Sequence, residues 1–297
     1  METAVKHWTT ASLIQWSAEY LREKGFDNSR LEAERLLAHV LGFSRIQLYL
    51  QHDRPLNAEE LSRFKLLFRK RLEHCPLQYL IGETEFMSLP LTVSPAVLIP
   101  RPETEVLVER ARQICQSEWG DGDPPRVLDI GTGSGAIAVA LAHYQPQIHL
   151  TAIDQSAAAL EVARQNAARH HLEDRIEFIL QDMTSPWPAS CLNSFDLVLS
   201  NPPYISEREF PELAEEIRRY EPRSALVAQQ DGLEHYCLFA RLLPALLRPR
   251  GIALLEIGAD MAAAAQLCFS ASPFKEIVVL QDLAGKDRVL ELRIGER

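Results

Sequence analysis

The sequence predicts an α/β fold, in which a doubly wound, mostly parallel sheet of seven strands follows a small helical domain. Residues 8–74 carry apolar side chains at the spacing of amphipathic helices. After residue 125, short apolar runs alternate with helical segments, which is typical of parallel strands covered on both faces. The last two runs are separated only by residues 282–287, too few for a crossover helix, so we expect that pair to be antiparallel.

Three helices are expected in the N-terminal domain, which we place at residues 1–76. The first spans 9–25, with threonine caps at its start and a glycine at its end. The second starts at Asn28 or Ser29 and ends at Gly42, and the third spans 57–74 and ends in basic residues that suit a helix C-terminus. No catalytic chemistry is visible here. We interpret the domain as a scaffold or a surface on which a partner docks.

A linker is expected at residues 77–100, where apolar residues alternate with a period of two and predict a β-hairpin or a bridging strand. The catalytic domain is expected at residues 101–297. It begins with the run "RPETE" (Arg101 to Glu105), in which Pro102 starts a helix whose first turn is acidic. This run favours a helix start, and we assign it no catalytic step.

Seven strands are expected in the catalytic domain, at residues 126–130, 149–154, 175–180, 195–200, 251–257, 276–281 and 288–293. Helices are expected between them, at residues 135–144, 156–170, 232–247 and 259–271. In an open parallel sheet, ligands bind beyond the carboxyl ends of the strands, where the strand order reverses. The ends of the strands at 126–130 and 195–200 should therefore face one crevice.

The composition limits which partners and which cell compartment we expect for the protein. Asp and Glu number 41 against 31 Lys and Arg, and the net charge of −10 argues against nucleic acid as the main partner. Five scattered cysteines without a C-x-x-C pair indicate reduced thiols. We expect no metal, because no metal-ligand spacing is visible, and no signal peptide or membrane segment. The protein is expected to be soluble and cytoplasmic.

A glycine-rich segment, "DIGTGSG", follows the strand at 126–130. Gly131, Gly133 and Gly135 permit positive φ and let backbone N–H groups and a helix N-terminus approach a ligand closely. Asp154, at the end of the next strand, is placed to accept hydrogen bonds from ribose hydroxyls. These features indicate an adenosine cofactor. A pyrophosphate dinucleotide and S-adenosylmethionine both fit the pattern.

A second motif ends the strand at 195–200. Asn201, Pro202, Pro203 and Tyr204 form a stiff corner, because proline has no backbone N–H and cannot continue a strand. We expect this corner to face the same crevice as the glycine-rich segment. It places an amide, a proline carbonyl and an aromatic ring beside the cofactor.

Methylation of a planar, conjugated NH2 group accounts for these residue types. The nitrogen lone pair is delocalised, and no ordinary side chain can deprotonate such a group beforehand. The Asn201 side-chain oxygen and the Pro202 carbonyl can accept both N–H hydrogens, which fixes the nitrogen and stabilises its developing positive charge. Tyr204 offers a flat face to the planar group. A sulfonium methyl donor supplies its own leaving group, so the corner favours S-adenosylmethionine.

These motifs resemble the HemK/PrmC family of class-1 peptide-chain release factor glutamine N5-methyltransferases. The resemblance covers nearly the whole chain and includes "LIPRPETE", "DIGTGSG", "AID", "SNPPYI" and "YEPRSALVAQQDGLEHY". It implies the fold of class I S-adenosylmethionine-dependent methyltransferases, which is Rossmann-like. It also implies S-adenosylmethionine as donor, with S-adenosylhomocysteine as product. The acceptor would be the glutamine of the Gly-Gly-Gln loop of a release factor, docked partly by the helical domain.

The resemblance also implies the roles of individual residues. Asn201, Pro202, Pro203 and Tyr204 would grip the substrate glutamine, with Asn201, Pro202 and Tyr204 as the catalytic residues. Asn201 would contact the cofactor as well. The cofactor would be held by Gly131, Thr132, Gly133, Ser134, Gly135 and Asp154, and Asp182 and Met183 would line its adenine. Some family members carry an aromatic residue in place of Met183, but methionine also packs on an adenine face.

Three other functions remain open from the residues alone. An adenine-N6 methyltransferase on DNA or RNA would use the same corner, because the exocyclic amine of adenine is also planar. A methyltransferase acting on a ribosomal-protein glutamine is a closer alternative. A methyltransferase-like module that only binds is the third, and it is disfavoured by the complete glycine-rich segment and corner.

Overall fold

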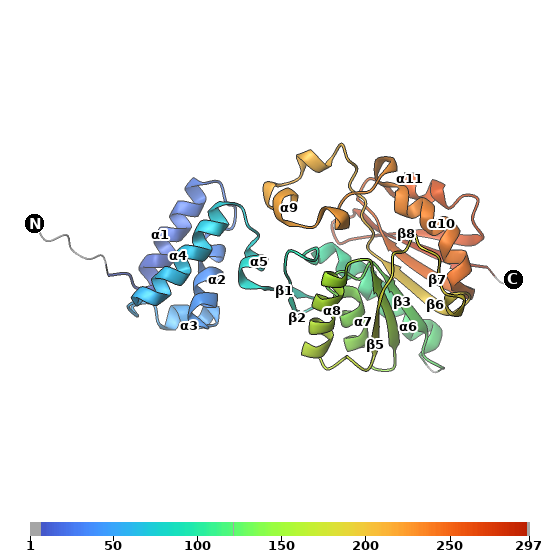
Figure 1. Cartoon of the computed structure of the whole chain (residues 1–297), viewed down its shortest axis with the longest axis horizontal. Coiled ribbons are helices and arrows are strands. Elements are labelled where there is room, and N and C mark those ends of the chain that lie inside the picture. The colour runs from blue at the N-terminus through green and yellow to red at the C-terminus, as the bar shows by residue number, and fades with distance from the viewer. Residues whose placement is uncertain (1–6, 121, 296–297) are drawn as a thin grey trace, which may run out of the picture. The chain divides into compact units, whose positions relative to one another are not determined.

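The computed structural model describes residues 7–120 and 122–295, which form two units (Figure 1). The first unit runs to Gly82 and also includes Glu215–Tyr220, and the second comprises the rest of the described chain from Glu83 onward. We expected the helical domain to end at residue 76. The helical unit continues to Gly82 because a further short helix, α5 (Leu77–Ile81), belongs to it.

The first unit contains α1 (Thr10–Glu23), α2 (Ser29–Leu41), α3 (Arg45–Leu50), α4 (Ala58–Leu72) and α5. Helices α1, α2 and α4 confirm the three predicted ones. Helices α3 and α5 were not predicted, because six and five residues are too few to display a helical period. Helix α5 occupies the start of the linker expected at 77–100.

The helices of this unit begin and end for local reasons. The side chains of Thr9 and Asn57 cap α1 and α4 by accepting hydrogen bonds from backbone N–H groups in the first turn. Gly42 ends α2 in the left-handed conformation, with φ of 67°. Asn28 makes no side-chain cap for α2. The buried core of the unit includes Leu21, Leu36, Leu37, Phe64 and Phe68.

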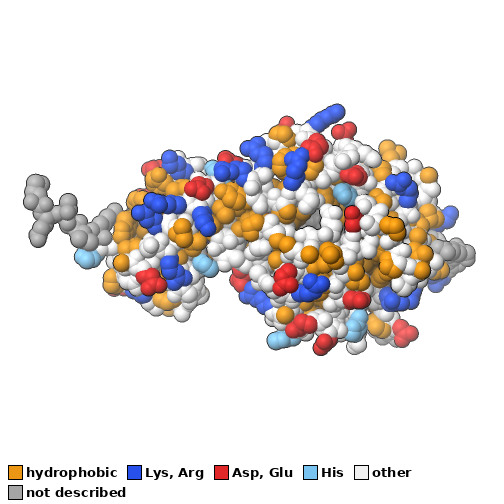
Figure 2. Space-filling view, viewed as in Figure 1, with side chains coloured by type: hydrophobic (Ala, Val, Ile, Leu, Met, Phe, Trp, Pro, Cys, Tyr) orange, Lys and Arg blue, Asp and Glu red, His pale blue; other side chains and the backbone are white. Residues whose placement is uncertain are grey.

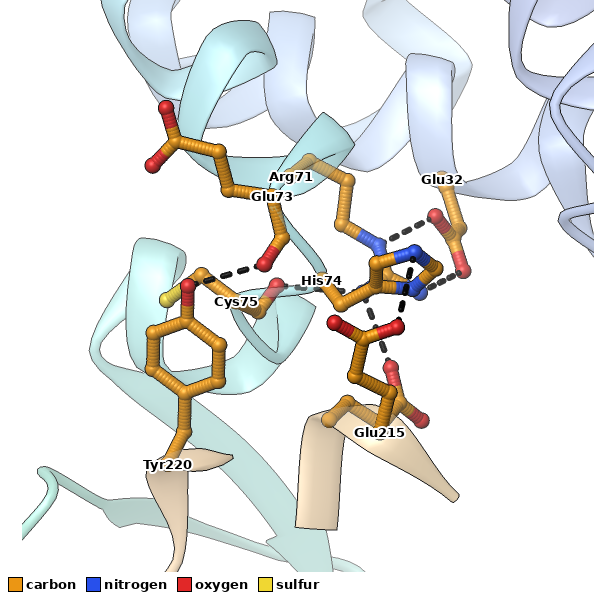
Figure 3. A network of polar contacts seen from close by, with 8 residues as sticks. Glu32, Arg71, Glu73, His74, Cys75, Glu215 and Tyr220 are labelled. Carbon is orange, nitrogen blue, oxygen red and sulfur yellow. Dashed lines mark hydrogen bonds and ion pairs between the residues drawn. The ribbon is translucent and has the colours of Figure 1, made fainter. Parts of the chain in front are cut away.

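A short helix far along the chain, α9 (Glu215–Tyr220), also belongs to the helical unit (Figure 3). The Arg71 guanidinium, which is 6% exposed, bonds Glu32 at 2.7 Å and Glu216 at 2.8 Å. The Tyr220 hydroxyl donates to a backbone carbonyl at the end of α4, at 2.8 Å. The chain therefore leaves the second unit to contribute α9 to the first, an excursion that we did not predict.

The second unit opens with an antiparallel hairpin of β1 (Glu83–Phe86) and β2 (Leu89–Thr92). A seven-stranded sheet follows, in the order β5-β4-β3-β6-β7-β9-β8. Its strands are β3 (Arg126–Ile130), β4 (His149–Asp154), β5 (Ile176–Leu180), β6 (Phe195–Ser200), β7 (Leu247–Glu256), β8 (Phe274–Gln281) and β9 (Asp287–Ile294). The strands from β5 to β7 pair in parallel, whereas β9 pairs antiparallel with both β7 and β8. This confirms the predicted fold class.

Helices cover both faces of the sheet (Figure 1). They are α6 (Glu105–Trp119), α7 (Ala136–Tyr144), α8 (Ala157–Arg169), α10 (Glu234–Leu246) and α11 (Ala262–Cys268). In β6, Leu197 and Leu199 pack in one core with α6 and α7, and Val198 between them packs in the other core with α10 and α11. This alternation is the period of two of a strand buried on both faces.

The order of the strands reverses between β3 and β6. From β3 the chain proceeds outward to β4 and β5, and then returns to place β6 on the other side of β3. This reversal lies where a doubly wound sheet offers a crevice to ligands. Within the described part of the chain, no helix has the length and apolar character to cross a membrane.

Candidate active site

A cavity of about 460 Å³ lies in the second unit, at the carboxyl ends of the central strands. Ile130, Asp154 and Asn201, which end β3, end β4 and follow β6, all line it. The motifs at 131–135 and 201–204 therefore meet at one site, as the strand order requires. Of the predicted residues, those that line the cavity are Gly131, Gly133, Asp154, Asp182, Met183, Asn201 and Pro203.

The three glycines of the first motif have different surroundings. All have positive φ, at 74° for Gly131, 56° for Gly133 and 79° for Gly135. A Cβ on Gly131 or Gly133 would meet nothing within 4 Å, so both leave open space on the cavity side. A Cβ on Gly135 would lie 3.1 Å from Ala163 Cβ, so this glycine allows α7 to begin close against α8.

Thr132 and Ser134 are buried and do not line the cavity. The Thr132 hydroxyl donates to Asp129 Oδ2 at 2.6 Å, and the Ser134 carbonyl accepts from Asn166 Nδ2 at 2.9 Å. These bonds hold the shape of the segment from behind. Contact of Thr132, Ser134 and Gly135 with a cofactor remains a prediction.

Asp154 presents a partly satisfied carboxylate to the cavity. Its two oxygens accept hydrogen bonds from the backbone N–H groups of Gly133 and Ser156, each at 2.9 Å. A carboxylate offers about four acceptor positions, so positions remain for two hydroxyl groups. Burial raises the pKa of Asp154, and hydrogen bonds from the backbone N–H groups of Ser156, Gly133 and Gln155 oppose that rise. The acceptor positions of Asp154 and the open space beside Gly131 and Gly133 fit the ribose of an adenosine cofactor.

A buried carboxyl that we did not predict lies behind this loop. Asp129 is inside β3, fully buried, and its Oδ1 has no hydrogen-bond partner among the described residues. Burial raises the pKa of Asp129 to about 7, and the Thr132 hydroxyl acts in the opposite direction. Asp129 contacts the loop and does not line the cavity. Its position inside an apolar strand was the signal in the sequence.

Asp182 and Met183 follow β5 and line the cavity. Asp182 Oδ1 accepts from the backbone N–H of Thr184 at 2.8 Å and from its hydroxyl at 2.7 Å, which fixes the turn. Met183 packs at the edge of the core formed with α10 and α11. Their contact with adenine remains a prediction.

The corner, Asn201–Tyr204, contains two acceptor oxygens that receive no hydrogen bond from the described residues. Asn201 is half-buried, and its Nδ2 donates to the Thr104 hydroxyl at 3.2 Å. No described residue donates to Asn201 Oδ1 or to the Pro202 carbonyl. Asn201 and Pro203 line the cavity, whereas Pro202 is buried behind it. The side-chain oxygen is thus available at the cavity edge.

Tyr204 does not line the cavity. Its ring packs at the edge of the core, and its hydroxyl donates to Glu256 Oε1 at 3.4 Å. Gly232, with φ of +87°, permits the close approach here, since a Cβ would lie 2.3 Å from the Tyr204 carbonyl oxygen. The predicted contact of the ring with a planar substrate group is not tested by this geometry and remains a prediction.

His235, at the start of α10, lines the cavity and was missed. Its Nδ1 lies 3.1 Å from the Pro203 carbonyl oxygen, and burial lowers its pKa.

The run "RPETE" also gains a structural role. Arg101 Nη2 bonds Glu221 Oε1 at 2.6 Å, and Glu221 Oε2 accepts from the backbone of Ile99, which joins this segment to the one that follows α9.

Glu256 is a further residue that sequence reasoning missed. It ends β7, is 2% exposed, and burial raises the pKa of its carboxyl to about 7. A glutamate in the apolar run "GIALLEI" was a visible signal, because a charged group in a covered strand requires partners. No comparable signal pointed to Thr104. Among the described residues, no group of three His, Cys, Asp or Glu side chains is placed to hold a metal ion.

Two family models match the chain: "PrmC N-terminal domain" over residues 12–82 and "Methyltransferase small domain" over residues 106–223. A release factor glutamine methyltransferase from Chlorobaculum tepidum is 45% identical over 287 residues, which cover 96% of this chain and 97% of that protein. One from Geobacter sulfurreducens is 41% identical, with 97% and 98% covered. A solved structure, the release factor-specific protein-(glutamine-N5) methyltransferase from Alicyclobacillus acidocaldarius, is 31% identical, with a TM-score of 0.40 over 69% of this chain and 99% of that one.

Proposed function

We propose that this chain, which belongs to the release factor glutamine methyltransferase family, methylates the side-chain amide nitrogen (N5) of the glutamine in the Gly-Gly-Gln motif of class-1 release factors. The observation that carries the proposal is the meeting of the glycine-rich segment, Asp154 and Asn201 at one cavity. The methyl donor is S-adenosylmethionine. The products are the methylated glutamine and S-adenosylhomocysteine.

The donor would be held by residues of three strand ends. Gly131 and Gly133 leave room for it, and Asp154 has acceptor positions for its ribose hydroxyls. Asp182 and Met183 would border its adenine. When bound, the donor supplies a methyl group on a positively charged sulfur, which leaves as a neutral thioether.

The acceptor amide would be fixed by the corner. Asn201 Oδ1 and the Pro202 carbonyl receive its two N–H groups, and both oxygens lack donors from the described chain. As the nitrogen lone pair turns toward the methyl group, positive charge develops on that nitrogen and is stabilised by the two oxygens. One proton then passes to solvent, so the product amide is neutral. Pro203 and Tyr204 would complete the pocket for the glutamine.

The helical unit would help to dock the release factor. Its helix α3 exposes Ile46 and Leu50, which are 72% and 75% exposed and lie one helical turn apart. Apolar side chains exposed together are typical of a contact surface. This role places the enzyme in translation termination and hence in the cytoplasm. We propose that the transfer requires no metal.

Mass spectrometry of release-factor peptides, after incubation with enzyme and S-adenosylmethionine, tests the proposal. We expect the Gly-Gly-Gln peptide to gain the mass of one methylene unit. Replacement Asn201→Ala removes one acceptor oxygen and should lower turnover by about 100-fold or more, with cofactor affinity within about threefold. Calorimetric titration measures that affinity. Near-normal turnover of the variant would contradict the role of Asn201.

The same assay separates the alternative substrates. Methyl transfer to adenine in oligonucleotides, without transfer to release factor, would favour a nucleic-acid enzyme. The face drawn in Figure 2 carries acidic and basic side chains side by side. Transfer to a ribosomal-protein glutamine alone would favour the second alternative. Cofactor binding without any transfer would leave a binding module.

A further inference from the structure

His235 is the only basic side chain among the described residues that line the cavity. The other ionisable side chains of the lining are carboxyls: Asp154 at the end of β4, Asp182 after β5, and Glu234 at the start of α10. Neither lysine nor arginine lines the cavity in the described part of the chain. The charge carried by the lining is therefore negative as long as the His235 ring is neutral.

The contact of His235 with the corner fixes the tautomer of its neutral ring. Nδ1 lies 3.1 Å from the Pro203 carbonyl oxygen, and a carbonyl can only accept a hydrogen bond. Nδ1 therefore carries the proton, and Nε2 keeps its lone pair, which receives no hydrogen bond from the described residues. Burial lowers the pKa of His235, whereas Glu234, the contact with Pro203 and Asp182 act in the opposite direction. The effect of burial is the larger, so the ring is mostly neutral above pH 7.

The same contact places His235 at the reacting end of the cavity. Pro203, which His235 bonds, follows Asn201 by two positions, and both line the cavity. Under the proposed function, the methyl group must be delivered to an amide held at this corner. His235 therefore lies at the end of the cavity that must face the positively charged sulfur of the donor. A positive charge on His235 would repel that sulfur, because charges in a partly buried site are only weakly screened.

We propose that His235 is a specificity-determining residue of the donor site: its neutral ring lets the cavity accept a sulfonium, and a cation in its place would shift the preference toward the neutral thioether product. S-adenosylmethionine and S-adenosylhomocysteine make this property measurable, because they differ by one methyl group and by the positive charge on sulfur. The inference rests on the proposed function, because that function brings the sulfur to the corner.

His235→Lys and His235→Asn separate the charge of the residue from its hydrogen bond. Lysine adds a positive charge beside the corner, and asparagine offers a neutral N–H donor near the position of Nδ1. At pH 7.5 we expect His235→Lys to weaken the affinity for S-adenosylmethionine by about tenfold or more, and that for S-adenosylhomocysteine by less than about threefold. His235→Asn should change the ratio of the two affinities by less than about twofold. Calorimetric titration of the full chain measures both affinities.

His149→Lys is the matched control. His149 is exposed and starts β4, whereas Asp154, which lines the cavity, ends the same strand. The control adds the same charge at the opposite edge of the sheet, where it should leave the affinity ratio within about twofold of the wild-type ratio. Melting temperatures of all three variants show whether each chain is folded. Equal weakening of both ligands in a folded His235→Lys variant, or an equally large shift in His149→Lys, would overturn the proposal.

The wild-type chain supplies a test that does not depend on the folding of the lysine variant. As the pH falls from 7.5 to 5, His235 takes up a proton, and the affinity for S-adenosylmethionine relative to that for S-adenosylhomocysteine should fall by about threefold or more. Asp154, Asp182 and Glu234 face the same cavity and are retained in His235→Asn, so the ratio in that variant reports their contribution alone. The same pH dependence of the ratio in both chains would contradict the role of His235.

Failure of this proposal and failure of the proposed function are distinguishable. Absence of glutamine methylation by the wild-type chain, together with the expected shift in His235→Lys, would overturn the proposed function alone. Methylation by the wild type, together with equal weakening of both ligands in a folded His235→Lys variant, would overturn the role of His235 and leave the proposed function standing.

Discussion

Asp129 and Glu256 are carboxyls inside the apolar strands β3 and β7, where burial disfavours their charged forms. Both lie behind a motif of the site, Asp129 against the glycine-rich segment through Thr132 and Glu256 against the corner through Tyr204. The pKa of each is raised by burial to about 7. At the residue scale, the site is therefore supported by groups that cost stability.

The raised pKa of Glu256 predicts a pH dependence of stability. Its ordinary pKa is 4.5, so between pH 4.5 and about 7 the unfolded chain releases a proton that the folded chain retains. The free energy of unfolding contributed by Glu256 therefore decreases as pH rises through this window and is constant above it. Glu256→Gln should gain about 1 to 3 kcal/mol relative to wild type between pH 5 and 7.5.

Urea unfolding of both chains at these two pH values measures that gain. The pKa of Asp129 is also raised, but Asp129 is present in both the wild type and the variant, so its contribution cancels. Arg288, Glu103 and Tyr204, which also act on the Glu256 carboxyl, are likewise unchanged. A difference in unfolding free energy that stays constant with pH would contradict the buried, protonated state of Glu256.

At the scale of single elements, helix α9 depends on its tertiary contacts. Its six residues make no independent helix, because so short a segment cannot offset the cost of nucleation. Its position depends on contacts to the helical unit, chiefly the ion pair of Glu216 with Arg71, whose guanidinium also stacks 4.4 Å from the Phe26 ring centroid. The other partner of Arg71 is Glu32, whose side chain is partly buried, with 13% exposed.

Arg71→Met should therefore destabilise the helical unit by about 3 kcal/mol, because it leaves the partly buried Glu32 carboxylate without its partner. Hydrogen exchange in residues 215–220 should become faster as well. The matched control is Arg219→Met, since Arg219 is 49% exposed and pairs with Glu215 within α9, and an exposed ion pair contributes little to stability. Equal losses in the two variants, measured by thermal unfolding, would contradict this account.

On the scale of the whole molecule, the chain passes between its two units at three places, at 82–83, 214–215 and 220–221. All the residues that line the cavity belong to the second unit, so we expect cofactor binding to be a property of that unit alone. We propose that the helical unit serves substrate selection. This division predicts that substitutions on the surface of the helical unit change the kinetics on intact release factor and leave the kinetics on a short peptide unchanged.

Ile46→Ser with Leu50→Ser should raise KM for intact release factor by about three- to tenfold, because apolar contact area is lost. Kinetics on a Gly-Gly-Gln peptide should not change. Leu283→Ser is the control, because Leu283 is fully exposed in the second unit. Parallel losses on factor and peptide, or an effect of Leu283→Ser as large as that of the double variant, would argue against docking by α3.

Much of the fold was predictable because its elements are long and periodic. The seven strands, the antiparallel final pair and helices α1, α2, α4, α7, α8 and α10 were expected near their observed positions. Helix α11, expected over 259–271, is shorter, at Ala262–Cys268. Helices α3, α5 and α9 were missed, because helices of four to six residues are defined by tertiary contacts and not by their own pattern.

The sequence by itself determined the reaction class, because glycines at positive φ and a proline-stiffened corner are local requirements that only a few residue types satisfy. It also predicted that these motifs meet, since parallel strands deliver their ends to one edge. Only the tertiary structure brought Thr104 to Asn201 and Glu256 to Tyr204, from segments 97 and 52 positions away in the chain. Hydrogen bonds between distant segments leave no periodic trace in a sequence, so that part of the site depends on packing alone.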